Sequence, residues 1–115
     1  MKVLFAAAEV APFSKAGGLA DVVGSLPKYL EKDAEIAVFT PLHGLIDINK
    51  YGIKELENSA LWLTFNGKGH KFRLFMCKLP GTDINVFFVH NDWYFTCFRD
   101  VYPKWLDPEY EHERY

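Results

Sequence analysis

The apolar positions in the first third of the chain change from strand-like to helix-like spacing. Residues 3–8 are a continuous apolar run, which predicts a buried β-strand. The next apolar positions recur at helical intervals and predict one apolar helix face, formed by Leu19, Val22, Val23, Leu26 and Leu30. Gly24 and Pro27 interrupt this pattern. We therefore expect a kink near residues 24–26 or a restart at Pro27, and a helix end near residues 32–33.

A second strand is predicted over residues 34–40, and the proline that follows should end it. A strand, a helix and a second strand in this order form a βαβ unit, whose crossover is almost always right-handed. The two strands are therefore expected to be parallel, with their carboxyl ends at the same edge of the sheet. Residues 41–52 are expected to form a loop, and residues 54–58 are too polar to assign.

The second half of the chain begins with a hairpin signature. Two β-favouring runs, residues 60–65 and 70–79, flank the turn sequence Asn66-Gly67-Lys68-Gly69. This hairpin should extend the sheet antiparallel or lie against its edge. Residues 84–90 predict a strand buried on both faces. Residues 91–108 are expected to be loop, and a helix is expected to begin at Pro108 and to fray.

This order of elements predicts the α/β fold class: a Rossmann-like partial domain with a mostly parallel sheet and an inserted β-hairpin. At 115 residues the chain is one domain at most. Half of its residues are hydrophobic, so it can bury a sizeable core. The net charge of −2 gives no general attraction to nucleic acid or anionic membranes, and no 18-residue apolar run is present to span a bilayer.

The first nine residues superficially resemble a secretion signal. Their apolar core is short, and Glu9 stands where a cleavage site would be. We interpret them as the first strand of a mature, cytoplasmic protein. In that setting Cys77 and Cys97, which lack metal-ligand spacing, are better explained as free buried thiols than as a disulfide.

Gly17 and Gly18 lie between the first predicted strand and the first predicted helix. In an open α/β sheet this junction lies at the carboxyl edge of the strands, where ligands bind. Glycine allows close approach to a ligand, helix N-terminal amides attract anions, and Lys15 adds a cation. The alternative is a tight turn with a solvated lysine. The stretch has neither the third glycine of a dinucleotide fingerprint nor the Gly-Lys-Ser/Thr of a P-loop.

Residues 2–13 and 15–27 closely resemble the amino terminus of bacterial glycogen synthases and plant starch synthases, which form glycosyltransferase family 5. The signature of that family, Lys-X-Gly-Gly-Leu, is present as Lys15-Ala16-Gly17-Gly18-Leu19. The resemblance implies the GT-B fold, in which two Rossmann-like domains face a cleft. Residues 1–115 would be a single partial domain, the start of the amino-terminal one. The chain is then a fragment, a truncated gene product or a shortened homologue.

Synthases of this family transfer glucose from ADP-glucose or UDP-glucose to the non-reducing end of an α-1,4-glucan, with retention of configuration and without a metal or other cofactor. The resemblance implies that Lys15, Gly17 and Gly18 contact the diphosphate. It also implies that Asp21 and Glu9 orient sugar hydroxyls. Most charged catalytic groups of the family lie in sequence beyond residue 115. The catalytic residues are therefore not identified here, and we expect the isolated chain to be inactive.

Each site residue also has a simpler explanation. Asp21 is favoured in a first helical turn by the helix dipole alone. Glu9 ends a strand, where an exposed position pointing into the cleft avoids a costly burial. Alternatively, Glu9 is a structural partner of Lys15 or of a backbone amide. Among the histidines, only His90 is a candidate, because it ends the last strand at the same edge as Glu9.

The aromatic residues after the last strand offer a candidate acceptor site. Tyr94 and Phe95 match an aromatic pair of the family and would stack on glucan sugars. The alternative is that these rings pack into the core. The family continues with Asp-Arg-Pro-Gly, whereas this chain has Thr96-Cys97-Phe98-Arg99, which weakens the comparison.

Two further classes of function stay open at the level of the sequence. One is a non-catalytic half-domain that binds glucan or a partner chain supplying the remainder. The other is an unrelated flavodoxin-like anion-binding domain. A partial sheet leaves an unpaired edge and an uncovered face, so we expect self-association or binding of a partner.

Overall fold

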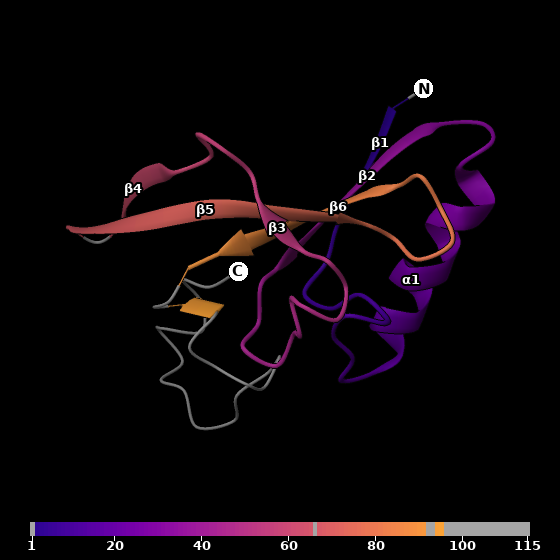
Figure 1. Cartoon of the computed structure of the whole chain (residues 1–115), viewed down its shortest axis with the longest axis horizontal. Helices are drawn as coiled ribbons and strands as arrows, with labels where there is room; N and C mark the ends of the chain where they lie inside the picture. The colour runs from indigo at the N-terminus through magenta and orange to yellow at the C-terminus, as the bar shows by residue number, and fades with distance from the viewer. Residues whose placement is uncertain (1, 66, 92–93, 96–115) are drawn as a thin grey trace.

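The computed structural model of the chain describes residues 2–65, 67–91 and 94–95. In this part of the chain the strands form one six-stranded mixed sheet in the order β1-β2-β6-β5-β3, with β4 paired to β5 (Figure 1). The α/β class with parallel core strands is thus confirmed. The elements in chain order are β1 (Lys2–Ala6), α1 (Gly18–Leu30), β2 (Glu35–Pro41), β3 (Lys54–Glu55), β4 (Leu61–Phe65), β5 (Lys68–Lys78) and β6 (Asn85–His90).

The centre of the sheet is parallel, as the βαβ pattern predicted. Strand β1 pairs parallel with β2, and β2 pairs parallel with β6. The carboxyl ends of these strands therefore share one edge of the sheet. Strand β1 lies at the end of the strand order and has only β2 as a neighbour in the described chain.

The predicted hairpin is present and extends the sheet antiparallel. Strand β5 pairs antiparallel with β6 through its second half and with β4 through its first half. Because Phe65 is opposite Lys68, the turn is shorter than the sequence suggested, and Gly67 supplies the positive φ of 76° that it needs. The hairpin and α1 lie at opposite ends of the molecule in Figure 1.

Helix α1 turns a different face to the core from the one that the apolar spacing predicted. Its buried residues are the small or compact ones, Ala20, Val23, Gly24 and Pro27. Of the predicted face, Val23 is buried and Leu30 is partly buried, whereas the larger side chains Leu19, Val22 and Leu26 are exposed. The helix also continues through Pro27 without the predicted restart, and it ends at Leu30.

Gly24 explains which face is turned inward. A Cβ atom at this position would lie 2.6 Å from the backbone oxygen of Ala11, closer than real Cβ contacts allow. The Ala11 N–H also donates a 3.0 Å hydrogen bond to the Ala20 carbonyl. Only a small-residue face permits the helix to approach the preceding loop this closely.

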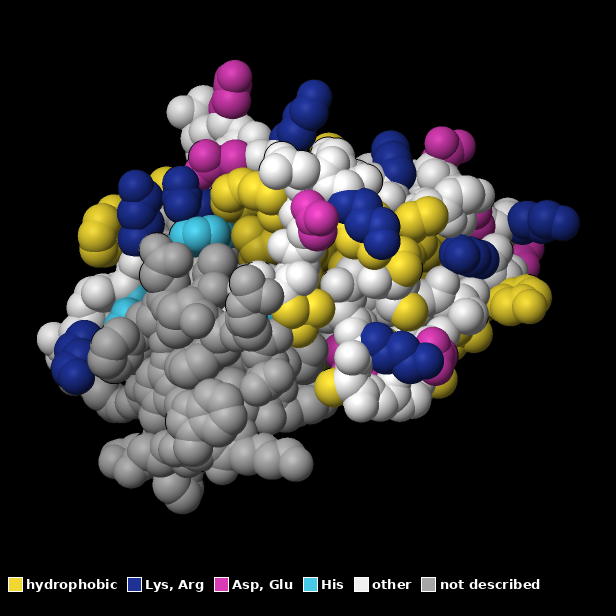
Figure 2. Space-filling model, turned by 60° about the horizontal axis from the view of Figure 1, so that its bottom comes forward, with side chains coloured by type: hydrophobic (Ala, Val, Ile, Leu, Met, Phe, Trp, Pro, Cys, Tyr) yellow, Lys and Arg dark blue, Asp and Glu magenta, His cyan; other side chains and the backbone are white. Residues whose placement is uncertain are grey.

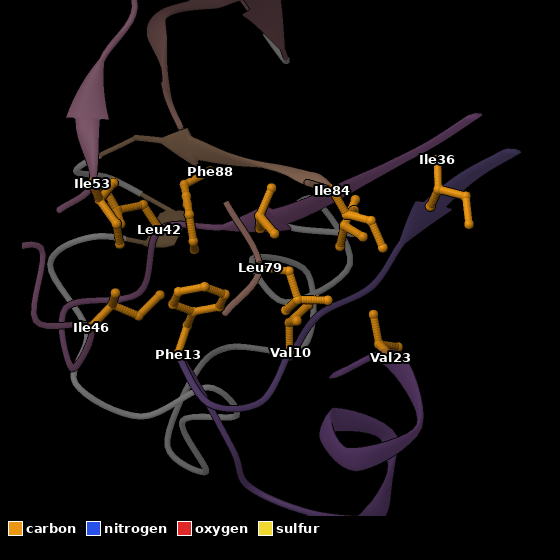
Figure 3. Close-up of a cluster of buried hydrophobic side chains, with 12 residues drawn as sticks. Val10, Phe13, Val23, Ile36, Leu42, Ile46, Ile53, Leu79, Ile84 and Phe88 are labelled. Carbon is orange, nitrogen blue, oxygen red and sulfur yellow. The ribbon is translucent and has the colours of Figure 1, made fainter. Parts of the chain in front are cut away.

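The core lies between one face of the sheet and α1, and part of it comes from the loop that joins β1 to α1. Figure 3 shows Phe13 of this loop facing Phe88 of the sheet, and Val10 between the sheet and the helix. The Phe13 ring packs edge-on against Phe88 of β6, with 5.1 Å between centroids, and against Tyr51, at 4.9 Å. The hydrophobic effect therefore helps to hold this loop against the sheet.

Strand β6 is buried on one face rather than on both. Val86 and Phe88 are fully buried against the core, whereas Phe87 is only partly buried on the opposite face. There Phe87 stacks on Phe39 of β2, with centroids 4.8 Å apart. The expected helix at Pro108 and the thiol of Cys97 lie outside the described residues, while Cys77 is a free thiol. No helix in the described chain has the length and apolar character needed to cross a membrane.

Candidate functional site

The loop between β1 and α1 is closed by two hydrogen bonds between Val10 and Ser14. The Ser14 N–H donates to the Val10 carbonyl at 2.9 Å, and the Val10 N–H donates to the Ser14 hydroxyl at 3.2 Å. Ser14 is 1% exposed, so these bonds are shielded from water. The backbone of the next residue, Lys15, is therefore fixed on its N-terminal side.

The Glu9 carboxylate accepts backbone N–H groups from the first turn of α1 and from the residues just before it. Its Oε2 accepts the N–H groups of Ala16 at 2.6 Å and of Gly17 at 3.2 Å, and its Oε1 accepts the N–H of Ala20 at 3.1 Å. Glu9 is 1% exposed. The predicted exposed position is therefore wrong, and the alternative of a backbone-amide partner describes the structure. Burial is tolerated because the carboxylate satisfies N–H groups that a helix start leaves unpaired.

Lys15 and Asp21 form an ion pair at the N-terminus of α1, which we call the helix mouth. The Lys15 Nζ lies 2.8 Å from Asp21 Oδ2, and each side chain is 57% exposed. Asp21 stands in the first turn of α1, where the helix dipole also favours a carboxylate. The Lys15 ammonium is therefore already paired with a carboxylate at the start of the helix.

The two glycines differ in what lies in front of them. Gly17 has an extended backbone with φ −159°, and a Cβ there would meet Glu9 Oε1 at 3.6 Å, an ordinary contact. A Cβ at Gly18 would have no atom within 4 Å. Neither the backbone nor the packing of the described chain therefore requires glycine at position 18. The open space in front of it is available to a ligand.

The charges at the mouth do not add up to a positive site. The described side chains there are one ammonium, from Lys15, and two carboxylates, from Glu9 and Asp21. Figure 2 likewise shows basic and acidic side chains interspersed on the face in view rather than one basic surface. Attraction for an anion must come from the N–H groups of Gly18 and Leu19, for which the described chain supplies no hydrogen-bond acceptor.

A cavity of about 400 Å³ opens at the carboxyl edge of β1, β2 and β6, beside the strand end that leads to Glu9. Thr40 lines it and is 2% exposed, and its hydroxyl has no partner in the described chain. Close to this edge, the buried His43 ring donates from Nε2 to the Ala8 carbonyl at 2.7 Å. A larger hollow of about 550 Å³ lies at the opposite, amino edge, away from the candidate residues.

Sequence reasoning did not single out Ser14, Thr40 or His43. A signal was available for the last two, since Thr40 and His43 stand at and just after the end of the second predicted strand, on the ligand-binding edge. No comparable signal marks Ser14, because its role depends on the loop closing on itself.

The candidate acceptor residues are not exposed platforms. Tyr94 is 2% exposed and Phe95 is 7% exposed. The Tyr94 hydroxyl lies 3.2 Å from His70 Nε2, and the Tyr94 N–H donates to Asn91 Oδ1 at 2.7 Å. This geometry agrees with the alternative that these rings pack inward.

His90 is placed beside the hairpin. Its ring stacks on Phe75 at 5.6 Å, and its Nε2 lies 3.4 Å from a guanidinium nitrogen of Arg73. Arg73 in turn contacts Glu55 at 3.1 Å. His90, at the end of β6, therefore contacts the ion pair formed by Arg73 of β5 and Glu55 of β3. Among the described residues no three His, Cys, Asp or Glu side chains are grouped to hold a metal ion.

Comparison with known proteins adds a family match to this geometry. Residues 2–115 match the family described as the starch synthase catalytic domain. The chain is 42% identical over 107 residues to the glycogen synthase of Thermotoga maritima, covering 89% of this chain and 22% of the relative. It is 39% identical over 111 residues to a glycogen synthase of Streptococcus agalactiae, covering 95% and 22%. The chain thus spans about a fifth of the length of these relatives.

A solved structure shows the same fold. It is the catalytic domain of starch synthase IV from Arabidopsis thaliana bound to ADP and acarbose. The match has a TM-score of 0.75 and 24% sequence identity, and it covers 90% of this chain and 21% of the other.

Proposed function

Because this chain belongs to the starch synthase catalytic domain family, we propose that residues 1–115 form the start of a glycosyltransferase and contribute its donor-binding edge. The reaction proposed is transfer of glucose from ADP-glucose or UDP-glucose to the non-reducing end of an α-1,4-glucan. The structural relative from Arabidopsis is described as bound to ADP and acarbose, a nucleotide and a sugar-like ligand, which supports this pair of substrates.

Gly18 carries the proposal. Neither the backbone conformation nor the packing of the described chain requires glycine at this position, and it faces open space at a helix N-terminus. A ligand phosphate placed there would accept hydrogen bonds from the Gly18 and Leu19 N–H groups. A side chain at this position would occupy the space that the phosphate needs. Gly17 would also allow a ligand to approach the backbone, but its N–H group already donates to Glu9.

Lys15 and Asp21 are the proposed side-chain contacts. Both are half exposed, so the ion pair between them exchanges easily for a ligand. Lys15 would turn to the diphosphate and stabilise it as the glucose C1–O bond breaks, an electrostatic role. Asp21, released from Lys15, would then accept a hydrogen bond from a sugar hydroxyl. The new bond forms between C1 and the acceptor oxygen, the proton of that hydroxyl passes to the departing diphosphate, and the nucleoside diphosphate leaves.

A fusion tests this proposal. The chain replaces the corresponding start of the Thermotoga maritima glycogen synthase, and glucose transfer from ADP-glucose to glycogen is measured. We expect the fusion to be active and the isolated chain to be inactive. Gly18→Ala in the fusion should leave its thermal unfolding unchanged but lower transfer at least about tenfold, the equivalent of ~1.4 kcal/mol.

Gly69→Ala is the matched control. Its Cβ would make only an ordinary 3.9 Å contact with Trp62, far along the chain from the helix mouth. This variant should keep full transfer. An inactive but folded fusion, or a Gly18→Ala fusion with the activity and KM of the parent, would contradict the proposal.

A further inference from the structure

We propose that Glu9 is a positioning residue: it sets the backbone that binds the donor diphosphate and does not itself touch the donor. This inference rests on the proposed function and assigns Glu9 a different role from the sugar contact that the family resemblance implied. The starting observation is that the carboxylate is 1% exposed and accepts three backbone N–H groups.

The first step concerns Lys15. Its chain neighbours on both sides are tied to the segment that follows β1: Ser14 bonds to Val10, and Ala16 donates to Glu9 at 2.6 Å. The Lys15 backbone is therefore fixed on both sides, while its side chain stays 57% exposed. A fixed backbone lowers the ordering cost of binding, because only the side chain must adapt to a ligand.

The second step concerns the amides of the helix mouth. Glu9 occupies the N–H groups of Gly17 and Ala20, on either side of Gly18 and Leu19. An incoming anion is thus repelled from the occupied amides and directed to the two between them. This is also where a Cβ would meet nothing within 4 Å. Glu9 therefore decides which amides remain available to the ligand.

The third step separates this role from a direct contact. To reach a sugar hydroxyl, the Glu9 carboxylate would have to leave three amides, and the amide of the buried Ala20 would then lack an acceptor, which is unfavourable. Asp21 is half exposed at the same mouth and needs no such rearrangement. The geometry therefore gives the hydroxyl contact to Asp21 and the positioning role to Glu9.

Binding of ADP and of ADP-glucose to the fusion of this chain with the remainder of the Thermotoga maritima glycogen synthase distinguishes the two roles. ADP lacks the glucosyl group, so the loss of a sugar contact would weaken only ADP-glucose. Glu9→Gln keeps the shape of the side chain but replaces one acceptor oxygen by a donor, so it loses amide partners. We expect it to weaken both ligands by the same factor, about tenfold, measured by NMR titration of the Gly18 and Leu19 amides.

Two variants and one further readout complete the test. Glu31→Gln makes the same chemical change at the other end of α1, where Glu31 accepts the Asp83 N–H at 3.3 Å, and should leave both affinities unchanged. Ser14→Ala removes the hydroxyl that accepts the Val10 N–H, one of the two bonds that anchor the other side of Lys15, and should again weaken both ligands equally, even if Glu9→Gln does not fold. Hydrogen exchange at the Ala16 and Ala20 amides should accelerate in folded Glu9→Gln.

The outcomes separate cleanly. Selective weakening of ADP-glucose by Glu9→Gln would overturn the positioning role in favour of a sugar contact. Unchanged affinity for both ligands in folded Glu9→Gln, or in Ser14→Ala if the first variant does not fold, would also overturn it. If the unmutated fusion bound neither ligand, the proposed function would fail and this inference with it.

Discussion

Replacing Gly24 by alanine tests how closely helix α1 packs on the loop that precedes it. The added Cβ would lie 2.6 Å from the Ala11 oxygen, 3.1 Å from the Ala11 Cβ and 3.3 Å from its carbonyl carbon. The clashing atoms belong to the backbone or are fixed to it, so they cannot move away by a rotamer change. The helix and the loop would have to separate, which would also strain the bond from Ala11 N–H to the Ala20 carbonyl.

The magnitude follows from two opposing terms. Forcing an extra methyl group into a well-packed site costs about 1–3 kcal/mol. Alanine in a helix interior gains roughly 1 kcal/mol over glycine. We therefore expect Gly24→Ala to lower the free energy of unfolding by about 0–2 kcal/mol, the balance of these terms.

Urea unfolding followed by circular dichroism measures this difference. Gly18→Ala is the matched control in the same helix, because its Cβ meets nothing within 4 Å and should leave the stability unchanged or slightly raised. If Gly24→Ala proved as stable as Gly18→Ala, the helix would not approach Ala11 this closely, and the explanation of its inward face would be refuted.

Three other predictions follow from single features of the structure. Burial raises the pKa of the Cys77 thiol to about 11, so its alkylation rate, mapped by mass spectrometry, should rise with a midpoint near pH 11; a midpoint near the ordinary value would contradict burial of this thiol. Asp21→Asn removes the half-exposed pair with Lys15 and should change the free energy of unfolding by less than about 1 kcal/mol in urea titrations, and still less in high salt. Leu4 is 62% exposed on the edge strand β1, so the chain should self-associate in sedimentation velocity and Leu4→Lys should weaken this; a monomer at every concentration would show the edge prediction to be wrong.

Local patterns predicted the elements well because each pattern is read from neighbouring residues. The apolar runs gave the strands to within a few residues, and the Asn66-Gly67 turn gave the hairpin. The two-residue strand β3 was not predicted, because Lys54 and Glu55 are polar and pair only through contact with β5. An element held by one long-range pairing leaves no periodic signal in its own sequence.

The candidate site was likewise predicted where its residues are close in the sequence and not where a contact depends on the fold. The sequence placed Lys15, Gly18 and Asp21 at one helix mouth, since they are close along the chain and the strand-helix junction fixes their edge of the sheet. It left the direction of Glu9 open between solvent and backbone amides. That choice depends on how the loop folds, and the loop is held by Phe13 packing on Phe88 and by Ser14 bonding to Val10.

The sequence alone therefore determined the order of the helix and of every strand except β3, the parallel centre of the sheet, the hairpin and the family. Tertiary structure decided which side of α1 faces inward and where the Glu9 carboxylate lies. The helix carries apolar residues on more than one side, so periodicity cannot choose between them. The choice is made by the close approach of Gly24 to Ala11, a contact between segments that are separate in the sequence and meet only in the folded chain.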